Sequence, residues 1–345
     1  MKWQCYSLAG TSFHFGQLGG NQEEISVGFS SDSLFAALVH TAAQSMEPSA
    51  FESLIESFRD GDPGFLLTSA FPRAGDVRFY PMPLLRDRID FEALGITLKD
   101  IKKTAYLSEG LFLRLLAGEP VSVVYDPSVS FPLQGKTVWV SKAEYENLPE
   151  IVKEKGRIWT LEKRPRVTLD RESSASSLFF TGHVDFATEC GLWFGLSERK
   201  PAAFDIDGLL GKLADQGFGG VRSAGFGAAK LTKSDKIELP DADGRRWITL
   251  SRYLPAPDEV PGVLEGETAY SLDEIGGWLY SSSVRSERRR TVHMITEGSV
   301  LSGTGKSVYG EMTDVQPDYE GTRPVGHPVW RNGFAAAVGL AERKD

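Results

Sequence analysis

The stretch Gly217-Phe-Gly-Gly-Val-Arg-Ser-Ala-Gly-Phe-Gly227 decides how this chain is interpreted. Five of its eleven residues are glycine, and Arg222 carries its only charge. Glycine adopts positive φ angles easily and lets the backbone come close to a ligand, because no Cβ stands in the way. Exposed amide groups beside one guanidinium suit an anion, most naturally a phosphate. A plain glycine-rich turn that packs a helix on a sheet is the alternative, and the spacing alone leaves both open.

The residues on either side of this stretch indicate a helix before it and a strand after it. Apolar residues recur between Ile206 and Leu213 with the spacing of an amphipathic helix, and 228–232 has the composition of a strand. Loops that bind nucleotide phosphates in P-loop and Rossmann proteins follow a strand and precede a helix, whose positive end faces the phosphates. Here the loop follows the negative end of a helix, so Arg222 must supply the charge. This order argues against a mononucleotide pocket and is compatible with a nucleic-acid backbone lying across the loop.

The length and composition bound the class of protein. At 345 residues, with 41% hydrophobic and 25% charged residues and 36 glycines, the chain fits two domains of a loop-rich α+β protein. No apolar run approaches the length of a membrane span, and Met1-Lys-Trp-Gln-Cys5 lacks the apolar core of a signal peptide. Cys5 and Cys190 show no CxxC spacing, so neither a disulfide framework nor a zinc site is predicted. We therefore expect a cytoplasmic protein that holds no metal and no cofactor.

The charge is distributed unevenly. A net charge of −9 is unusual for a protein that binds nucleic acid alone through a broad basic face. Two basic strips stand out: Lys153 to Arg171, with seven Lys or Arg against three acidic residues, and Arg285 to Arg290, with four arginines against one glutamate. Each strip taken alone could be a solvated face or a set of internal salt bridges. If the chain binds a polynucleotide, it uses such strips locally or shares the phosphates with partner subunits.

The pattern of apolar residues predicts two units. In the first, strands are expected at 3–8, 65–85, 137–140, 158–161, 167–169, 178–186 and 191–196, and helices at 30–44, 51–58 and, broken at Gly95 and Gly110, 91–117. In the second, a strand at 247–250 is followed by a helix at 272–280 and strands near 291–295, 308–315 and 334–340. The strand–helix–strand–strand order in each half suggests two ferredoxin-like (RRM-like) domains, over 1–236 and 245–345. The insertions, including an exposed hairpin tip at 171–177, fall in the first domain.

No convincing catalytic set is visible. Gly303-Thr-Gly-Lys-Ser307 resembles the end of a Walker A motif, but Val300 stands where that motif needs a glycine. The five histidines form no metal-binding pattern. His14, between Phe13 and Phe15, is the one plausible general base, and it could also be a histidine packed among aromatics. Phe218 and Phe226 could offer a face on which RNA bases stack, or could equally pack in the core.

Several segments together resemble a known family. The glycine-rich stretch is similar to that of the RAMP superfamily of CRISPR proteins. Phe13-His-Phe-Gly16 with 31–37 resembles the N-terminal signature of the fourth Csm subunit of type III-A effector complexes. Its inserted hairpin resembles Arg164-Pro-Arg-Val-Thr-Leu-Asp-Arg171, and its C-terminal segments resemble 298–300, 309–310 and 327–333.

This resemblance implies a fold, a ligand and partners. It implies two ferredoxin-like domains that cap the repeat-derived 5′ handle of the crRNA in antiviral defence. It also implies docking against the large Cas-ten subunit, the backbone RAMP subunit and other Csm subunits. Members of this subunit group are not themselves the target nuclease, in agreement with the missing catalytic set.

The predicted site is an RNA-binding surface without a metal or catalytic residue. Gly219, Gly220 and Gly225 would give access to the backbone, Arg222 would pair with a handle phosphate, and Ser223 would hydrogen-bond it. The complete predicted set is Gly217, Gly219, Gly220, Arg222, Ser223, Gly225 and Gly227 in the loop, with Arg164, Arg166 and Arg171 along the path of the RNA. The alternative function is a RAMP endoribonuclease that processes precursor crRNA with His14 as general base.

Overall fold

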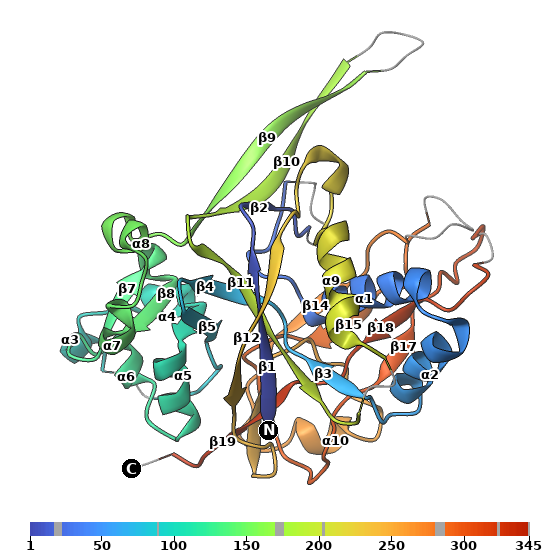
Figure 1. Cartoon of the computed structure of the whole chain (residues 1–345). Coiled ribbons are helices and arrows are strands. Elements are labelled where there is room, and N and C mark those ends of the chain that lie inside the picture. The colour runs from blue at the N-terminus through green and yellow to red at the C-terminus, as the bar shows by residue number, and fades with distance from the viewer. Residues whose placement is uncertain are drawn as a thin grey trace.

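The glycine-rich stretch joins a helix to a strand, as the sequence predicts. In the computed structural model, helix α9 (Ile206–Gln216) precedes it and strand β12 (Lys230–Glu238) follows it. The structure describes residues 1–16, 23–87, 90–169, 176–201, 204–279, 287–322 and 325–343. Strands β9 (Trp159–Leu169) and β10 (Ser176–Phe186) form a hairpin that projects from the body of the molecule (Figure 1). The mixed α+β class is therefore confirmed.

The remaining helices and strands are distributed over both halves of the chain. The other helices are α1 (Ser31–Ser45), α2 (Pro48–Arg59), α3 (Phe91–Leu94), α4 (Leu98–Lys103), α5 (Glu109–Leu116), α6 (Ser122–Tyr125), α7 (Lys142–Tyr145), α8 (Glu150–Lys155) and α10 (Val260–Val263). The other strands up to the glycine-rich stretch are β1 (Lys2–Ala9), β2 (Ser12–Phe13), β3 (Phe65–Leu67), β4 (Phe71–Ala74), β5 (Val77–Pro81), β6 (Tyr106–Ser108), β7 (Ser130–Leu133), β8 (Val138–Ser141) and β11 (Cys190–Glu198). The strands after β12 are β13 (Arg246–Thr249), β14 (Leu272–Ile275), β15 (Val292–Ile295), β16 (Val300–Ser302), β17 (Met312–Asp314), β18 (Trp330–Asn332) and β19 (Ala337–Leu340).

A large sheet with the order β12-β1-β11-β4-β5-β6-β8-β7 forms the framework, and β3 also pairs with β11. Strand β1 lies antiparallel between β11 and β12. Helix α9 is tied to β1 by the Tyr6 hydroxyl, which donates to Asp207 Oδ1 at 2.6 Å. Helix α1 is tied to α9 by the Thr41 hydroxyl, which donates to Gln216 Oε1 at 3.2 Å. These bonds fix the start of the glycine-rich stretch against the sheet.

The projecting hairpin is one continuous ribbon. The sequence predicted separate strands at 158–161 and 167–169, but β9 runs unbroken from Trp159 because every residue from there to Leu169 has a register partner on β10. Pro165 is tolerated inside this ribbon, where it lies opposite Phe180. At its base, β10 also pairs with β2. Residues 171–175 of the predicted exposed tip lie outside the described residues, while 176 and 177 belong to β10.

Two further predictions differ from the structure. The predicted break at Gly110 is wrong: α5 begins at Glu109, and the interruption is strand β6. Gly110 belongs in the first turn because its amide donates to Glu144 Oε1 at 2.9 Å, and a Cβ there would lie 2.8 Å from Glu144 Oε2. The predicted helix at 272–280 is also wrong, since Leu272–Ile275 is strand β14, paired with β15. Gly276 and Gly277 end the strand, and cross-strand pairing outweighs the helix preference of its acidic residues.

Buried polar contacts join the two halves of the chain. Arg331 in β18 donates through Nη1 to Asp32 Oδ2 at the start of α1, and both side chains are almost completely buried. The amide of Ser69 donates to the carbonyl of Leu250 at 2.8 Å. No helix in the described part of the chain combines the length and apolar content that crossing a bilayer requires.

Candidate nucleic-acid interface

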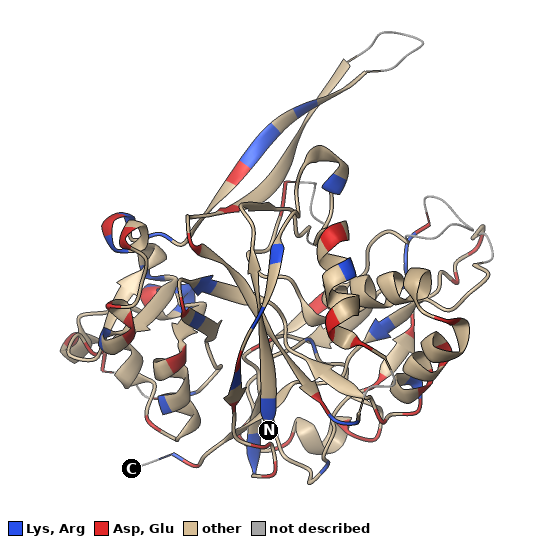
Figure 2. Ribbon diagram, viewed as in Figure 1, with Lys and Arg blue, Asp and Glu red and all other residues tan. Residues whose placement is uncertain are grey.

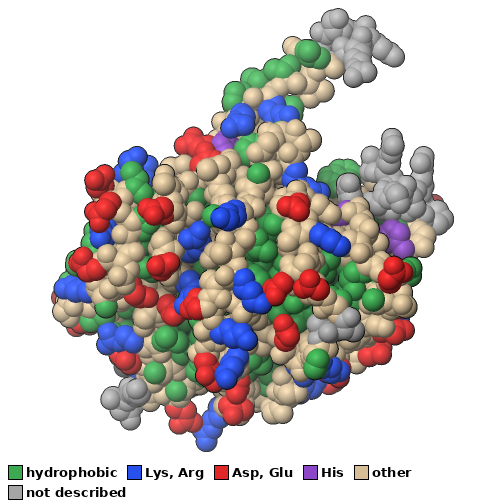
Figure 3. Space-filling model, in the orientation of Figure 1, with side chains coloured by type: hydrophobic (Ala, Val, Ile, Leu, Met, Phe, Trp, Pro, Cys, Tyr) green, Lys and Arg blue, Asp and Glu red, His purple; other side chains and the backbone are tan. Residues whose placement is uncertain are grey.

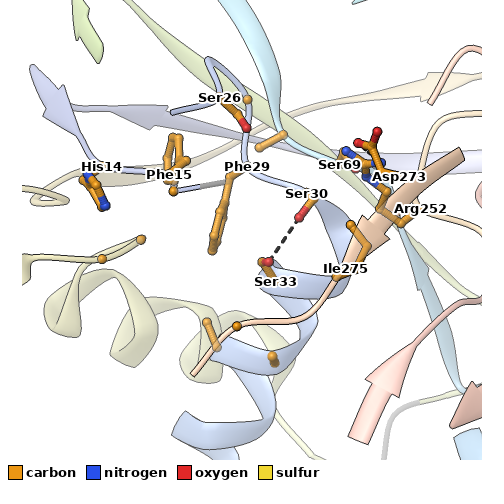
Figure 4. A pocket seen from close by; sticks show the side chains of 18 of the residues that line it. His14, Phe15, Ser26, Phe29, Ser30, Ser33, Ser69, Arg252, Asp273 and Ile275 are labelled. Carbon is orange, nitrogen blue, oxygen red and sulfur yellow. Dashed lines mark hydrogen bonds and ion pairs between the residues drawn. The ribbon is translucent and has the colours of Figure 1, made fainter. Parts of the chain in front are cut away.

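A groove of about 1590 Å³ lies between the two halves of the chain. One wall comes from residues 14–16, the first half of α1 and the glycine-rich stretch from Gly217 to Arg222. The other comes from residues 271, 273–278, 288, 289 and 291, together with Arg252 and Arg331. In Figure 4, His14, Phe15 and Phe29 lie on one side of this space, and Arg252, Asp273 and Ile275 on the other. The lining carries five arginines and three carboxylates, so the groove is locally positive in an acidic chain.

The glycine-rich stretch closes into a compact loop on the N-terminal residues. The Phe218 amide donates to the Gly227 carbonyl at 2.8 Å, and the Gly220 amide donates to the His14 carbonyl at 2.9 Å. Gly219 has φ +84°, and a Cβ there would lie 2.6 Å from the His14 oxygen. Glycine is therefore required at 219 for close packing on the protein itself. The structure confirms the packing turn, and the same stretch forms part of a groove wall, while phosphate binding by this loop stays a prediction.

The predicted loop residues separate into two groups. Gly217, Gly219, Gly220 and Arg222 line the groove. Ser223, Gly225 and Gly227 belong to the same loop but do not line it. Nothing lies within 4 Å of the position that a Cβ on Gly225 would occupy, so its surroundings are open.

Arg222 presents an exposed guanidinium at the groove. Its Nη1 donates to the carbonyl oxygens of Gln216 at 3.3 Å and Gly217 at 3.4 Å. It therefore caps the negative end of α9, a favourable place for a cation. Those partners are neutral carbonyls, so its charge stays available to an anion. Burial, and secondly the charge of Arg222, lowers the pKa of the nearby His40, which leaves that imidazole neutral at pH 7.

The prediction that Phe218 or Phe226 offers a stacking face is wrong, because both rings are buried. Phe218 meets Phe29 edge-on, with ring centroids 6.4 Å apart. Phe226 lies beneath the guanidinium of Arg164, whose Cζ is 5.0 Å from the ring centroid. The exposed aromatic of the groove is Trp278, 60% exposed. Trp278 was not predicted from the sequence, although its position directly after two glycines and before the arginine strip is a usable signal.

The hairpin arginines approach the loop from one side. Arg164 is exposed and Arg166 half-buried on β9, and the contact with Phe226 sets Arg164 beside the glycine-rich stretch. Neither lines the groove itself. Figure 2 shows basic residues on β9 and on the loop that follows α9. Arg171 lies outside the described residues.

The second basic strip reaches the same groove. Arg288 and Arg289 line it, and Arg288 Cζ lies 4.8 Å from the centre of the Trp278 ring. Arg290 points elsewhere and pairs with Asp318 at 3.2 Å. Arg285 lies outside the described residues. The sequence identified this strip but could not bring it opposite the glycine-rich stretch, because that meeting depends on how the two halves dock.

His14 joins the hairpin, the glycine-rich stretch and the groove. Its ring is 7% exposed, and Nδ1 donates to the Gly182 carbonyl at 2.7 Å. Nδ1 therefore carries the proton in the neutral ring, which leaves Nε2 as an acceptor. Across the described ranges, no group of three His, Cys, Asp or Glu side chains could hold a metal ion. The site is thus a polar, arginine-bearing groove with one buried imidazole in its wall.

Comparisons of sequence match this chain to one family. A family profile described as the CRISPR Csm4 C-terminal domain matches residues 242–340. A protein from Methanocaldococcus jannaschii, named CRISPR system Cms protein Csm4, is 24% identical over 342 residues, which cover 89% of this chain and 86% of that protein. Its namesake from Streptococcus thermophilus is 25% identical over 324 residues, covering 92% and 93%. One from Mycobacterium tuberculosis is 31% identical over 155 residues, covering 42% and 49%.

Solved structures share the fold. A chain in the crystal structure of a Csm3–Csm4 subcomplex of the type III-A CRISPR-Cas interference complex aligns with a TM-score of 0.62 at 18% identity, covering 98% of this chain and 99% of that one. A chain in the crystal structure of a Csm1–Csm4 cassette with cA4 aligns with a TM-score of 0.56 at 20% identity, covering 100% of both. The chain is therefore similar to Csm4 proteins: the profile matches its C-terminal part, and the relatives and the shared fold extend along nearly the whole sequence.

Proposed function

We propose that this chain is a non-catalytic subunit of a type III-A Csm effector complex, and that it binds the 5′ handle of the crRNA in the groove between its two halves. The observation that carries this is the meeting of Arg222 and the second basic strip on opposite walls of one groove. A single strand needs such positive charge along its backbone and an aromatic face for its bases, which Trp278 supplies. Arg164 and Arg166 extend the basic surface onto the hairpin.

The solved structures of similar proteins support a proposal of partner subunits. The solved structures that share this fold are of Csm4 with Csm3 and with Csm1. We propose that this chain likewise contacts the backbone RAMP subunit, the large Cas-ten subunit and other Csm subunits, in the cytoplasm. The net charge of −9 agrees with an assembly in which neighbouring subunits neutralise part of the RNA.

The finer description of the fold is part of the same proposal. The order β12-β1-β11-β3, with α1 and α9 in the two crossovers and every pair antiparallel, is that of a β-α-β-β-α-β unit. This order supports a ferredoxin-like first domain over 1–236, with residues 71–186 largely inserted. In the second half, β13 lies between β16 and β19, which supports a separate domain over 245–345.

The loop should anchor RNA through Arg222. We expect Arg222→Gln to weaken binding of a labelled RNA transcribed from the CRISPR repeat roughly tenfold, because a charge-assisted hydrogen bond contributes on the order of 1.5 kcal/mol. The dependence of log K on log salt should fall by about 0.7, the value for one phosphate contact on a single strand. Fluorescence anisotropy across a salt titration measures both quantities.

A matched control removes a positive charge elsewhere. Arg245 is 88% exposed and pairs with Glu342 away from the groove. Arg245→Gln should therefore leave both the affinity and the salt dependence nearly unchanged. If Arg222→Gln behaved like Arg245→Gln, the assignment of the glycine-rich stretch to the RNA would be refuted.

The endoribonuclease alternative is distinguished by the same RNA. Incubation without metal should leave it intact, because His14 would have to act without an acidic partner: the second groove histidine, His40, has a lowered pKa. Specific cleavage that is lost in His14→Ala would establish the enzyme instead.

A further inference from the structure

Arg289 occupies an unusual position at the second wall of the groove. Its backbone amide donates to the Gly277 carbonyl at 2.9 Å, which holds the segment against residues 276–278. Gly277 has φ +110°, and nothing lies within 4 Å of the position its Cβ would take, so the backbone beside Arg289 is open. The side chain lines the groove and is only partly exposed.

The guanidinium of Arg289 has no counterion in the described chain. Its Nε is buried and makes no hydrogen bond, and no carboxylate oxygen of the described residues lies within ion-pair distance of it. The carboxylate whose charge favours the charged form of Arg289, Asp32, is engaged by Arg331. Burial, and secondly the charge of Arg331, lowers the pKa of Arg289 to about 10, which still leaves it charged at neutral pH. A buried cation without a partner destabilises the free chain.

The other groove arginines are satisfied in different ways. Arg252 pairs with Asp273 at 2.6 Å, and Arg331 pairs with Asp32. Arg222 bonds to carbonyl oxygens, and Arg288 lies over the Trp278 ring. Arg289 is thus the groove arginine whose charge and donors are both left without a partner. Its planar set of donors matches the geometry of a phosphate.

We propose that Arg289 forms an anion subsite that takes a phosphodiester group of single-stranded RNA, with Trp278 and Arg288 beside the adjoining nucleotide. This inference rests on the proposed function and deepens it, because it assigns a phosphate contact to the wall opposite the glycine-rich stretch. Both domains would then contact the bound strand, the first through Arg222 and the second through Arg289.

The test compares Arg289→Gln with Arg290→Gln in the full chain. The two variants remove the same charge from neighbouring positions, but Arg290 pairs with Asp318 and does not line the groove. The probe is a fluorescein-labelled oligouridylate of about ten nucleotides, within the range that single-strand sites cover. Anisotropy across a salt titration gives affinity and salt dependence, and thermal unfolding of the RNA-free chain gives stability.

Arg289→Gln should weaken binding about tenfold and lower the salt dependence by about 0.7, the value for one lost phosphate contact. Its unfolding temperature without RNA should equal or exceed that of the wild type, since an uncompensated charge is removed. Arg290→Gln should change affinity and salt dependence little, and Arg289→Lys should retain most of the salt dependence. A purely structural arginine would not give weaker RNA binding together with an equal or higher unfolding temperature.

Four outcomes overturn the inference. If Arg289→Gln lowers the unfolding temperature of the free chain by several degrees, the residue is structural. If it binds RNA like Arg290→Gln while Arg222→Gln weakens binding, the subsite is wrong and the proposed function stands. If neither Arg222 nor Arg289 matters, or the wild type binds no RNA, both fail together. Unchanged RNA binding with lost assembly onto a partner subunit would assign Arg289 to a protein carboxylate instead.

Discussion

Replacing Asp32 by Asn tests the buried ion pair that joins the two halves of the chain beside the groove. Asp32 and Arg331 are 0% and 2% exposed, and they connect α1 in the first half to β18 in the second. Asn at 32 leaves the Arg331 charge buried without a counterion, a loss of about 3 to 5 kcal/mol in the free energy of unfolding. With a urea m-value on the order of 3 kcal/mol per molar, the unfolding midpoint should fall by roughly 1 to 1.7 M.

The loss of stability caused by Asp32→Asn should depend on pH, because the same ion pair sets the pKa of Asp32. Burial alone would raise the pKa of Asp32, but the Arg331 charge overcomes it, and the net pKa lies below its ordinary 3.8. A carboxylate with a lowered pKa stabilises the folded chain above its unfolded pKa, and this stability is lost as the pH falls through the folded value. The difference between wild type and Asp32→Asn should therefore be complete at pH 7 and should shrink only below about pH 3.8.

Two controls accompany this measurement by urea unfolding. Asp318→Asn breaks the pair with Arg290, which is 47% and 65% exposed at its two ends, and should cost less than about 1 kcal/mol. The double variant Asp32→Leu with Arg331→Met should recover most of the loss, because an apolar pair needs no counterion. A loss below about 1 kcal/mol for Asp32→Asn at pH 7 would refute the reasoning.

Three further predictions concern the loop, the thiols and the groove. Gly227→Ala should destabilise the chain and weaken RNA binding in anisotropy, because a Cβ at φ +84° would clash with the Phe218 carbonyl; Gly225→Ala, which meets no atom, should show only backbone strain of about 1 to 2 kcal/mol. Burial raises the pKa of Cys5 and of Cys190 to about 12, so neither thiol should react with a thiol reagent at pH 8 before the chain unfolds in urea. The free energy of unfolding should fall as the pH rises from 9 toward 12, because only the unfolded thiols ionise in that range. Trp278→Ala should weaken binding of the oligouridylate by about 1 to 3 kcal/mol, and Trp278→Phe by less; equal affinity for all three chains would exclude stacking.

Local patterns predicted much of the fold. Strand β1 and helix α1 were predictable because apolar spacing and a serine-rich start are properties of a few neighbouring residues. The helix expected at 272–280 was wrong because its residues are held as a strand by β15, a partner that local spacing does not reveal. Likewise, the sequence left Phe218 and Phe226 open between a stacking face and core packing, and only the docking of the loop on residues 12–14 explains their burial.

The candidate site was predictable in part. The density of glycines around Arg222 identified one wall of the groove from sequence. The opposite wall could not be placed from sequence, because Trp278 and Arg289 reach the groove only when the two halves of the chain dock. The lack of a counterion at Arg289 is a property of the folded arrangement, since Glu287 is only two residues away in the sequence and yet bonds to Tyr319.

The projecting hairpin is held more firmly near the body of the molecule than farther out. Near the body, β10 is bonded on both sides, by β9 and by β2 at Val184 and Asp185. Farther out, Leu169 and Leu178 are 68% and 62% exposed, and Figure 3 shows hydrophobic side chains uncovered along the ribbon. The outer half therefore depends on a single ladder without a core to support it. Amide hydrogen–deuterium exchange should therefore be slow at the root of the hairpin and steadily faster farther out. A binding partner that covers the exposed apolar side chains should slow exchange in the outer half and remove this difference.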